Sequence, residues 1–212
     1  MDYYNSYIKY KFKYINLKYS KQIGGAIDLK QPEHIENTKI VQERFINNTA
    51  LAHSINDPSI LKILNEAYKE DKKEFIPLSK EGCDAIMWKI LYKNELAGFG
   101  VTTDLTQFEN DSNFQIKGGI KGAKGLYITS IASNPSYRGI VNILFKYIDK
   151  YAIENDYDYL LLEAKKYDDN HLVDLYSRYG FIKIKELTED GEVGTLMCKD
   201  IKEGFECVSR IK

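Results

Sequence analysis

The sequence predicts an α/β (α+β) fold in which helices cover both faces of a mixed, mostly antiparallel sheet. Between residues 125 and 164, two apolar runs of strand length flank one helical pattern. Strands joined by a single helix pair in parallel, with a right-handed crossover. Two further pairs of apolar runs, at 84–102 and 182–199, are joined by short polar turns and predict antiparallel hairpins. With 212 residues and 43% hydrophobic residues, the chain is large enough for one such domain and its core.

The chain begins with a basic segment over residues 1–22, where five lysines stand against one aspartate. An apolar stripe alternates four and three residues apart, which predicts a short helix; it consists of Tyr3, Tyr7, Tyr10, Tyr14 and Leu17. Such a helix either contacts a membrane surface or nucleic acid, or packs on its own domain or on a second copy of the chain; its shortness favours packing. Gly24-Gly25 and Pro32 predict a linker over residues 23–37. The domain proper is expected at 38–200, with a tail at 201–212.

The first half of the domain carries three predicted elements and a loop. Residues 38–55 are ambiguous between a strand and a strand followed by a helix. Asn56-Asp57-Pro58 predicts a helix start, because it offers a capping side chain and a proline in the first turn. The strands at 84–91 and 95–102 form the first hairpin. Residues 103–124 form a long polar loop of the kind that often binds ligands, and its Asp104 and Glu109 are candidates for attracting a cationic substrate.

The central stretch is the most regular part of the chain. Leu126 to Ala132 reads as a strand that Asn134-Pro135 ends. Arg138-Gly139 leads into a helix whose apolar residues recur at helical spacing: Val141, Leu144, Phe145, Ile148 and Ala152. Tyr157 to Ala164 is a continuous apolar run, typical of a strand covered on both faces. The first strand therefore ends beside a helix N-terminus, whose unpaired N–H groups favour an anion such as phosphate.

The last part predicts a helix and an edge hairpin. The helix leads up to Tyr176, and Gly180-Phe181 ends it and opens the next strand. The strands at 182–187 and 193–199, joined by a turn at 189–191, form a hairpin at the far edge of the sheet. The tail either covers a sheet edge or extends from the domain.

Two motifs resemble the GCN5-related N-acetyltransferases, the GNAT superfamily. Ile131 to Gly139 matches the pattern hydrophobic-x-x-x-Pro-x-Tyr-Arg-Gly, which in that family opens the helix that holds the diphosphate of acetyl-coenzyme A. Leu175 to Phe181 matches Leu-Tyr-x-x-x-Gly-Phe. The motifs occur in the family's order with a strand between them, and the closely matching stretch that contains them covers about a quarter of the chain. The basic leader and its Gly-Gly pair also resemble short leaders in proteins of giant DNA viruses.

The GNAT resemblance implies transfer of acetyl from acetyl-coenzyme A to an amine, by direct attack in a ternary complex and without a metal. The implied acetyl-coenzyme A site is a turn that binds the diphosphate and a backbone N–H near Ile131 or Ala132 that polarises the thioester carbonyl. The residues of the turn are Tyr137, Arg138, Gly139, Ile140, Val141 and Asn142. Asn170 stands near the family's asparagine and either binds the pantetheine arm or caps its helix.

The resemblance also implies an acid for the departing thiolate and a base for the incoming ammonium. Tyr176 matches the acid position, and a phenol with a pKa of ~10 can share a proton with a thiolate near ~8.5. The alternative is that Tyr176 is a core tyrosine with a satisfied hydroxyl. Glu163 is the candidate base, and its alternative is a solvent-facing carboxylate at a strand end.

A second function stays open, that of a catalytically silent GNAT-like module that binds partners. In the family, two more small residues follow the Arg-Gly pair of the phosphate turn, and here those positions are Val141 and Ile143. Small residues let a backbone approach a phosphate closely, so these two changes favour the silent module.

Composition narrows the partners and the compartment. The net charge of −1 makes a nucleic-acid-binding protein unlikely, because that class needs a net basic surface. No apolar run is long enough to span a membrane. Three widely spaced cysteines, Cys83, Cys198 and Cys207, show neither metal-ligand spacing nor a disulfide framework. They indicate a reducing compartment such as the cytoplasm. If the protein is viral, the expected location is the host-cell cytoplasm or the virion.

Overall fold

A computed structural model of the chain describes residues 26–46, 57–67, 84–108, 118–165, 171–189 and 192–211. The predictions for residues 1–22, Asn170 and Glu109 fall outside the described residues. The elements are, in chain order, β1 (Ile27–Asp28), α2 (Pro32–Ile35), β2 (Thr38–Phe45), α4 (Pro58–Ala67), β3 (Ala85–Tyr92), β4 (Glu95–Asp104), the 3-10 turn η2 (Leu105–Phe108), β5 (Gly125–Ser133), β6 (Tyr137–Arg138), α5 (Ile140–Glu154), β7 (Tyr159–Lys165), α6 (His171–Ser177), β8 (Ile182–Glu189), β9 (Glu192–Asp200) and α7 (Cys207–Arg210).

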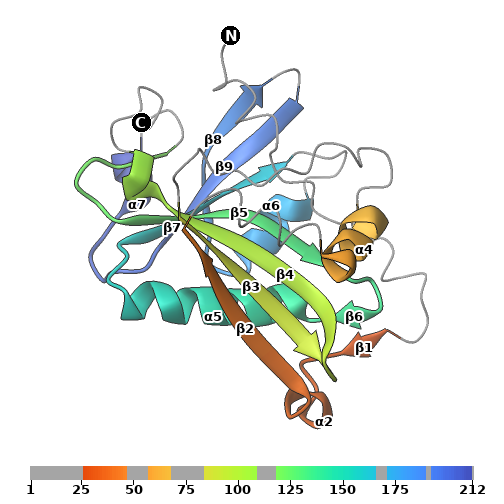
Figure 1. Ribbon diagram of the computed structural model, residues 1–212. Coiled ribbons are helices and arrows are strands. Elements are labelled where there is room, and N and C mark those ends of the chain that lie inside the picture. The colour runs from red at the N-terminus through yellow and green to blue at the C-terminus, as the bar shows by residue number, and fades with distance from the viewer. Residues whose placement is uncertain are drawn as a thin grey trace. The chain divides into compact units, whose positions relative to one another are not determined.

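The elements form the mixed, mostly antiparallel sheet that the sequence predicts (Figure 1). Its seven strands have the order β2-β3-β4-β5-β7-β9-β8. Strands β5 and β7 pair in parallel, whereas β2 with β3, β7 with β9 and β8 with β9 pair antiparallel. The parallel pair and the edge hairpin are confirmed. None of the helices in the described part of the chain is long and apolar enough to cross a membrane.

The chain divides into two compact units, which we describe separately. The first unit contains the described residues from 26 to 101 and from 130 to 146, and the second contains those from 102 to 129 and from 147 onward.

In the first unit, helices lie on both faces of the sheet. Phe99 and Val101 of β4 pack in a buried cluster with Ile60 and Ile63 of α4. The alternate residues of β4 face α5: Gly98 lies next to Ile140, and Gly100 lies next to Leu144. Since side chains alternate across a strand, α4 and α5 cover opposite faces here. Helix α4 begins where the sequence predicts, because the Asp57 carboxylate accepts a hydrogen bond of 2.8 Å from the Ser59 N–H. Hydrogen bonds from the Ser59 hydroxyl and then from the Ser59 N–H lower the pKa of Asp57.

Part of the segment expected as a linker is structured. From residue 26 onward it contains β1 and α2, and Leu29 between them is fully buried. Strand β1 pairs in parallel with β6 to form a separate two-stranded sheet. Two-residue strands carry no periodic pattern, so the sequence gives no signal for this pairing.

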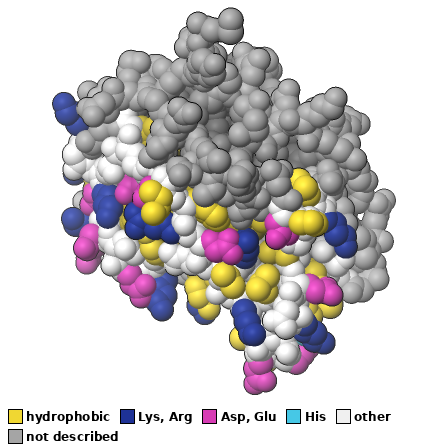
Figure 2. Space-filling model, in the orientation of Figure 1, with side chains coloured by type: hydrophobic (Ala, Val, Ile, Leu, Met, Phe, Trp, Pro, Cys, Tyr) yellow, Lys and Arg dark blue, Asp and Glu magenta, His cyan; other side chains and the backbone are white. Residues whose placement is uncertain are grey.

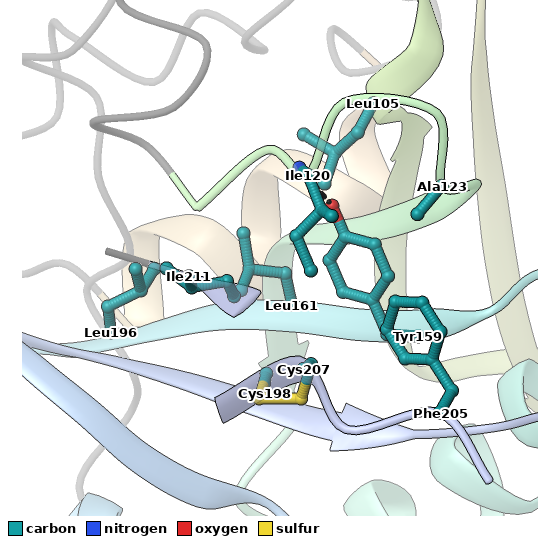
Figure 3. Packing of buried hydrophobic residues seen from close by; sticks show 10 residues of the cluster. All are labelled: Leu105, Ile120, Ala123, Tyr159, Leu161, Leu196, Cys198, Phe205, Cys207 and Ile211. Atoms are coloured by element: carbon teal, nitrogen blue, oxygen red, sulfur yellow. Dashed lines mark hydrogen bonds between the residues drawn. A yellow bond between two sulfur atoms is a disulfide. The ribbon is translucent and has the colours of Figure 1, made fainter. Parts of the chain in front are cut away.

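In the second unit, an apolar cluster covers one face of β7 and β9 (Figure 3). Tyr159 lies at its centre, with its ring stacked on Phe205 at 5.6 Å between centroids. The Tyr159 hydroxyl accepts a hydrogen bond of 3.1 Å from the Ile120 N–H and donates one of 3.3 Å to the Gly118 carbonyl. The chain before β5 and the tail after β9 are therefore held against the same tyrosine. The tail thus covers the sheet rather than extending from it.

A disulfide joins Cys198 of β9 to Cys207 of α7, so the reading of the cysteines as unpaired is wrong. Strand β9 ends at Asp200 and the chain turns back through residues 201–206, which brings the two Cα atoms within 6.5 Å. Asp200 supports this return by accepting a 2.8 Å hydrogen bond from the Cys207 N–H. The argument from the cysteines to a reducing compartment therefore no longer holds.

The described surface mixes both charges. On the face seen in Figure 2, basic and acidic side chains alternate with apolar ones. An ion pair joins Glu43 of β2 to Lys89 of β3 at 2.7 Å, and a second joins Arg44 of β2 to Asp84, just before β3, at 2.6 Å. Such partly exposed pairs contribute little to stability, at most about 1 kcal/mol each.

The disulfide predicts a redox-dependent stability. Because it closes a loop over a sequence separation of 9, reduction is expected to lower the free energy of unfolding by about 2–3 kcal/mol. Urea unfolding with and without dithiothreitol measures the difference, with thiol counting to verify reduction. The Cys198→Ser/Cys207→Ser variant should unfold at the reduced protein's midpoint and ignore the reductant. Equal midpoints for the oxidised and reduced protein would contradict this expectation.

Candidate functional site

The turn between β5 and α5 lies in the first unit and is built by local hydrogen bonds. The Asn134 side chain accepts a hydrogen bond of 2.9 Å from the Ser136 N–H, and the Asn134 backbone carbonyl accepts one of 3.0 Å from the Tyr137 N–H. Gly139 then adopts φ +86°, a left-handed conformation that favours glycine. Its carbonyl accepts the first bond of α5, from the Ile143 N–H at 3.1 Å. The turn thus ends in the N-terminus of a 15-residue helix, whose first N–H groups have no partner within the helix.

The side chains of the predicted turn point in different directions. Val141 is 8% exposed and belongs to the core, whereas Arg138 and Asn142 are exposed. Tyr137 donates a hydrogen bond of 3.3 Å to the Glu95 carboxylate and packs edge-on against Tyr92. Burial, and then the neighbouring Glu95 carboxylate, raise the pKa of Tyr137. The Tyr137 phenol is therefore engaged with β3 and β4, and its backbone N–H is used within the turn, where it donates to the Asn134 carbonyl.

Strand β1 runs parallel to β6, the two-residue strand within this turn. The sequence analysis did not predict this pairing. The Ile27 N–H donates to the Ser136 carbonyl at 2.9 Å, and the Leu29 N–H donates to the Arg138 carbonyl at 3.1 Å. A Cβ at Gly139 would lie 2.8 Å from Lys30 Cγ and 3.3 Å from an Asp28 carboxylate oxygen. The Asp28 carboxylate and the methylene stem of Lys30 therefore lie beside the predicted phosphate turn.

Ile131 and Ala132 lie in the second half of β5, and both are buried. In the described ladder between β5 and β7, only Gly125–Tyr127 is paired with Tyr159–Leu161. Residues 128–133 of β5 lie beyond that ladder.

In the second unit, Tyr176 lies near the end of α6, a helix that contacts β7 and β8. It is 3% exposed and packs edge-on against Phe181, with 6.2 Å between ring centroids. The Tyr176 carbonyl accepts from the Phe181 N–H at 3.2 Å. The second motif thus forms a compact helix end in which Tyr176 and Phe181 support each other.

Glu163 is buried on β7, with 3% of its surface exposed. The alternative of a solvent-facing carboxylate at a strand end is therefore wrong. Glu163 is paired with Leu196 of β9, so both lie on the face that carries Tyr159 and Leu161. Helix α6 contacts the strand that carries Glu163, so the two predicted catalytic residues belong to neighbouring elements.

Two other groups of titratable residues are engaged within the fold. Asp104 accepts a 3.0 Å hydrogen bond from the Tyr157 hydroxyl, and burial followed by this carboxylate raises the pKa of Tyr157. Cys198, Asp200 and Cys207 bring potential metal-ligand atoms within 4.8 Å of one another. Both sulfurs are joined in the disulfide and are not thiolates, so this cluster does not fit a metal centre.

Comparison with solved structures identifies the fold. An acyl-CoA N-acyltransferase from Pseudomonas aeruginosa matches with a TM-score of 0.51 at 15% identity, over 76% of this chain and 99% of that chain. FeeM, an N-acyl amino acid synthase from uncultured soil microbes, matches with a TM-score of 0.50 at 15% identity, over 78% and 93%. The fold is that of the acyl-CoA N-acyltransferases. No family model and no curated protein matches the sequence. The fold class predicted from the acyltransferase motifs is thus confirmed.

The turn at Gly139 predicts a substitution effect. Gly139→Ala is expected to destabilise the protein by more than the about 1–2 kcal/mol that a left-handed backbone costs an L-residue, because Lys30 crowds the new Cβ. Gly204→Ala is the matched control, since Gly204 has φ +74° and nothing within 4 Å of a Cβ. Urea midpoints compare the two variants. An equal loss of stability in both variants would show that Lys30 does not crowd the turn.

Proposed function

We propose that the protein transfers an acetyl group from acetyl-coenzyme A to an amine. The observation that carries the proposal is the β5–α5 turn. A strand whose parallel ladder stops after three pairs leads through Gly139 into a helix N-terminus, in a chain with the acyl-CoA N-acyltransferase fold. Helix N-termini bind phosphate through their free N–H groups and dipole. In this proposal the backbone N–H groups that follow Tyr137 in the turn, up to Asn142, bind the diphosphate, and Arg138 adds positive charge.

The chemistry assigns one role to each remaining residue. A backbone N–H near Ile131 or Ala132 polarises the thioester carbonyl. Glu163 accepts one proton from the substrate ammonium and later releases it to solvent. The neutral amine forms the C–N bond as the C–S bond breaks, and Tyr176 protonates the departing thiolate. The nitrogen loses its second proton after the bond forms, and this proton restores the Tyr176 phenol.

Acetyl-coenzyme A is expected to stabilise the folded protein. At a hundredfold excess over its Kd, the ligand should add about 2.7 kcal/mol to the free energy of unfolding. Thermal unfolding with and without the ligand measures this effect. Arg138→Glu should weaken it, and Lys146→Glu, the same charge change at an exposed position further along α5, should leave it intact. The absence of any shift at millimolar acetyl-coenzyme A would overturn the proposal.

Tyr176→Phe tests the acid role. Removing the hydroxyl should cut turnover by about 10²-fold, a typical contribution of proton transfer, without changing acetyl-coenzyme A affinity. Coenzyme A release from a panel of amines, peptides and polyamines measures turnover. Tyr147→Phe, on the exposed side of α5, is the control. Unchanged turnover in Tyr176→Phe would leave Tyr176 as a core residue.

A catalytically silent module is the second candidate, and one observation favours it. The Asp28 carboxylate stands beside Gly139, where it would repel a bound phosphate. This candidate expects neither a thermal shift with acetyl-coenzyme A nor release of coenzyme A.

A further inference from the structure

Gly194 lies inside strand β9, where glycine needs an explanation. Glycine in a strand interior costs roughly 0.5–1 kcal/mol relative to alanine. The backbone does not supply the reason, because Gly194 is not among the described glycines with positive φ. Such a glycine often marks a place where another group approaches the backbone closely.

The group that approaches Gly194 is the side chain of Glu163. A Cβ built at Gly194 would overlap Glu163 Oε1, and would lie 2.8 Å from its Cδ and 2.9 Å from its Cγ. Three consecutive atoms of the glutamate therefore cover the space that a side chain at position 194 would fill. Real Cβ atoms essentially never come closer than 3.0 Å to a neighbour, so the glutamate would have to leave this position.

The contact also fixes the direction of the carboxylate. Glu163 is paired with Leu196, and Gly194 is paired with Lys165, two residues further along β7. The glutamate therefore extends toward the C-terminal end of β7 and away from Leu161. That end lies beyond the ladder with β5, which stops at Leu161. Leu161 and Leu196, both buried, close the other side.

We propose that Gly194 is a positioning residue for Glu163. The missing side chain lets the carboxylate lie toward the end of β7, where it accepts the proton of the substrate ammonium. The role of Glu163 in proton transfer rests on the proposed function. The contact between Gly194 and Glu163 does not depend on that function.

Gly194→Ala tests the inference with three kinetic comparisons. Turnover in the coenzyme A release assay should fall at least tenfold, toward the roughly hundredfold loss expected for Glu163→Gln, while acetyl-coenzyme A affinity stays the same. In the Glu163→Gln background, Gly194→Ala should add no further loss of turnover. Gly100→Ala is the matched control, because this strand glycine has no neighbour closer than 3.4 Å to a Cβ. The inference would be overturned if Gly194→Ala lowered turnover further in the Glu163→Gln background. It would also be overturned if Gly194→Ala alone left turnover unchanged.

A spectroscopic measurement separates this inference from the proposed function. In protein labelled with ¹³C-glutamate, the Glu163 carboxyl resonance is the one that Glu163→Gln removes. It should move in Gly194→Ala and stay in place in Gly100→Ala, whether or not the protein turns over an amine. An unmoved resonance overturns the positioning role. A protein without acetyl transfer, but with the moved resonance, refutes only the proposed function.

A second variant covers the case in which Gly194→Ala does not fold. Glu163→Ala removes the atoms that overlap the new Cβ, so Glu163→Ala/Gly194→Ala should unfold at the midpoint of Glu163→Ala. A double variant that also fails to fold would show that Gly194 serves something other than Glu163, and would overturn the inference.

Discussion

The three parallel pairs between β5 and β7 are the constraint on which the other elements depend. Two parallel strands have to be joined by a crossover connection, and here α5 provides it between β5 and β7. The ladder therefore determines where the helix begins. The ladder starts at Gly125–Tyr159, where the Tyr159 ring passes over the Cα of the glycine. The same ring holds the chain before β5 through its hydroxyl and the tail through Phe205. A side chain at 125 would displace the ring and with it both segments.

Strand β7 combines two opposite demands. Its apolar residues Tyr159 to Leu162 are buried on both faces, as a central strand requires. Glu163 follows in the same strand and is equally buried, although a buried carboxylate costs stability unless it is paired or hydrogen-bonded. Glu163 therefore places a carboxylate inside the sheet, next to the end of the ladder with β5. This position is the reason that Glu163 is given the base role in the proposed function.

The sequence predicted those features that repeat locally, and missed those that depend on distant contacts. Helix α5 and strand β5 were recognisable because their apolar residues recur at helical or strand spacing, and the start of α4 because Asp57 caps it. Strand β1 has two residues and forms by pairing with β6, which lies about 110 positions later in the chain. The disulfide depends on the chain reversal after Asp200. Gly194 carried one usable signal, a glycine inside an apolar strand pattern, but its neighbour Glu163 lies 31 positions earlier.

Two features bear on phosphate binding at the turn, Val141 within the motif and Asp28 outside it. Valine in place of a small residue at 141 seemed to block the approach of a phosphate, yet its side chain is buried in the core and leaves the backbone N–H of the turn unchanged. The larger obstacle is electrostatic and comes from outside the motif. Asp28 brings a carboxylate to Gly139, whereas the part of Lys30 that lies beside the same glycine is its methylene stem. In the proposed function, the helix N–H groups and Arg138 have to outweigh the repulsion between this carboxylate and a diphosphate.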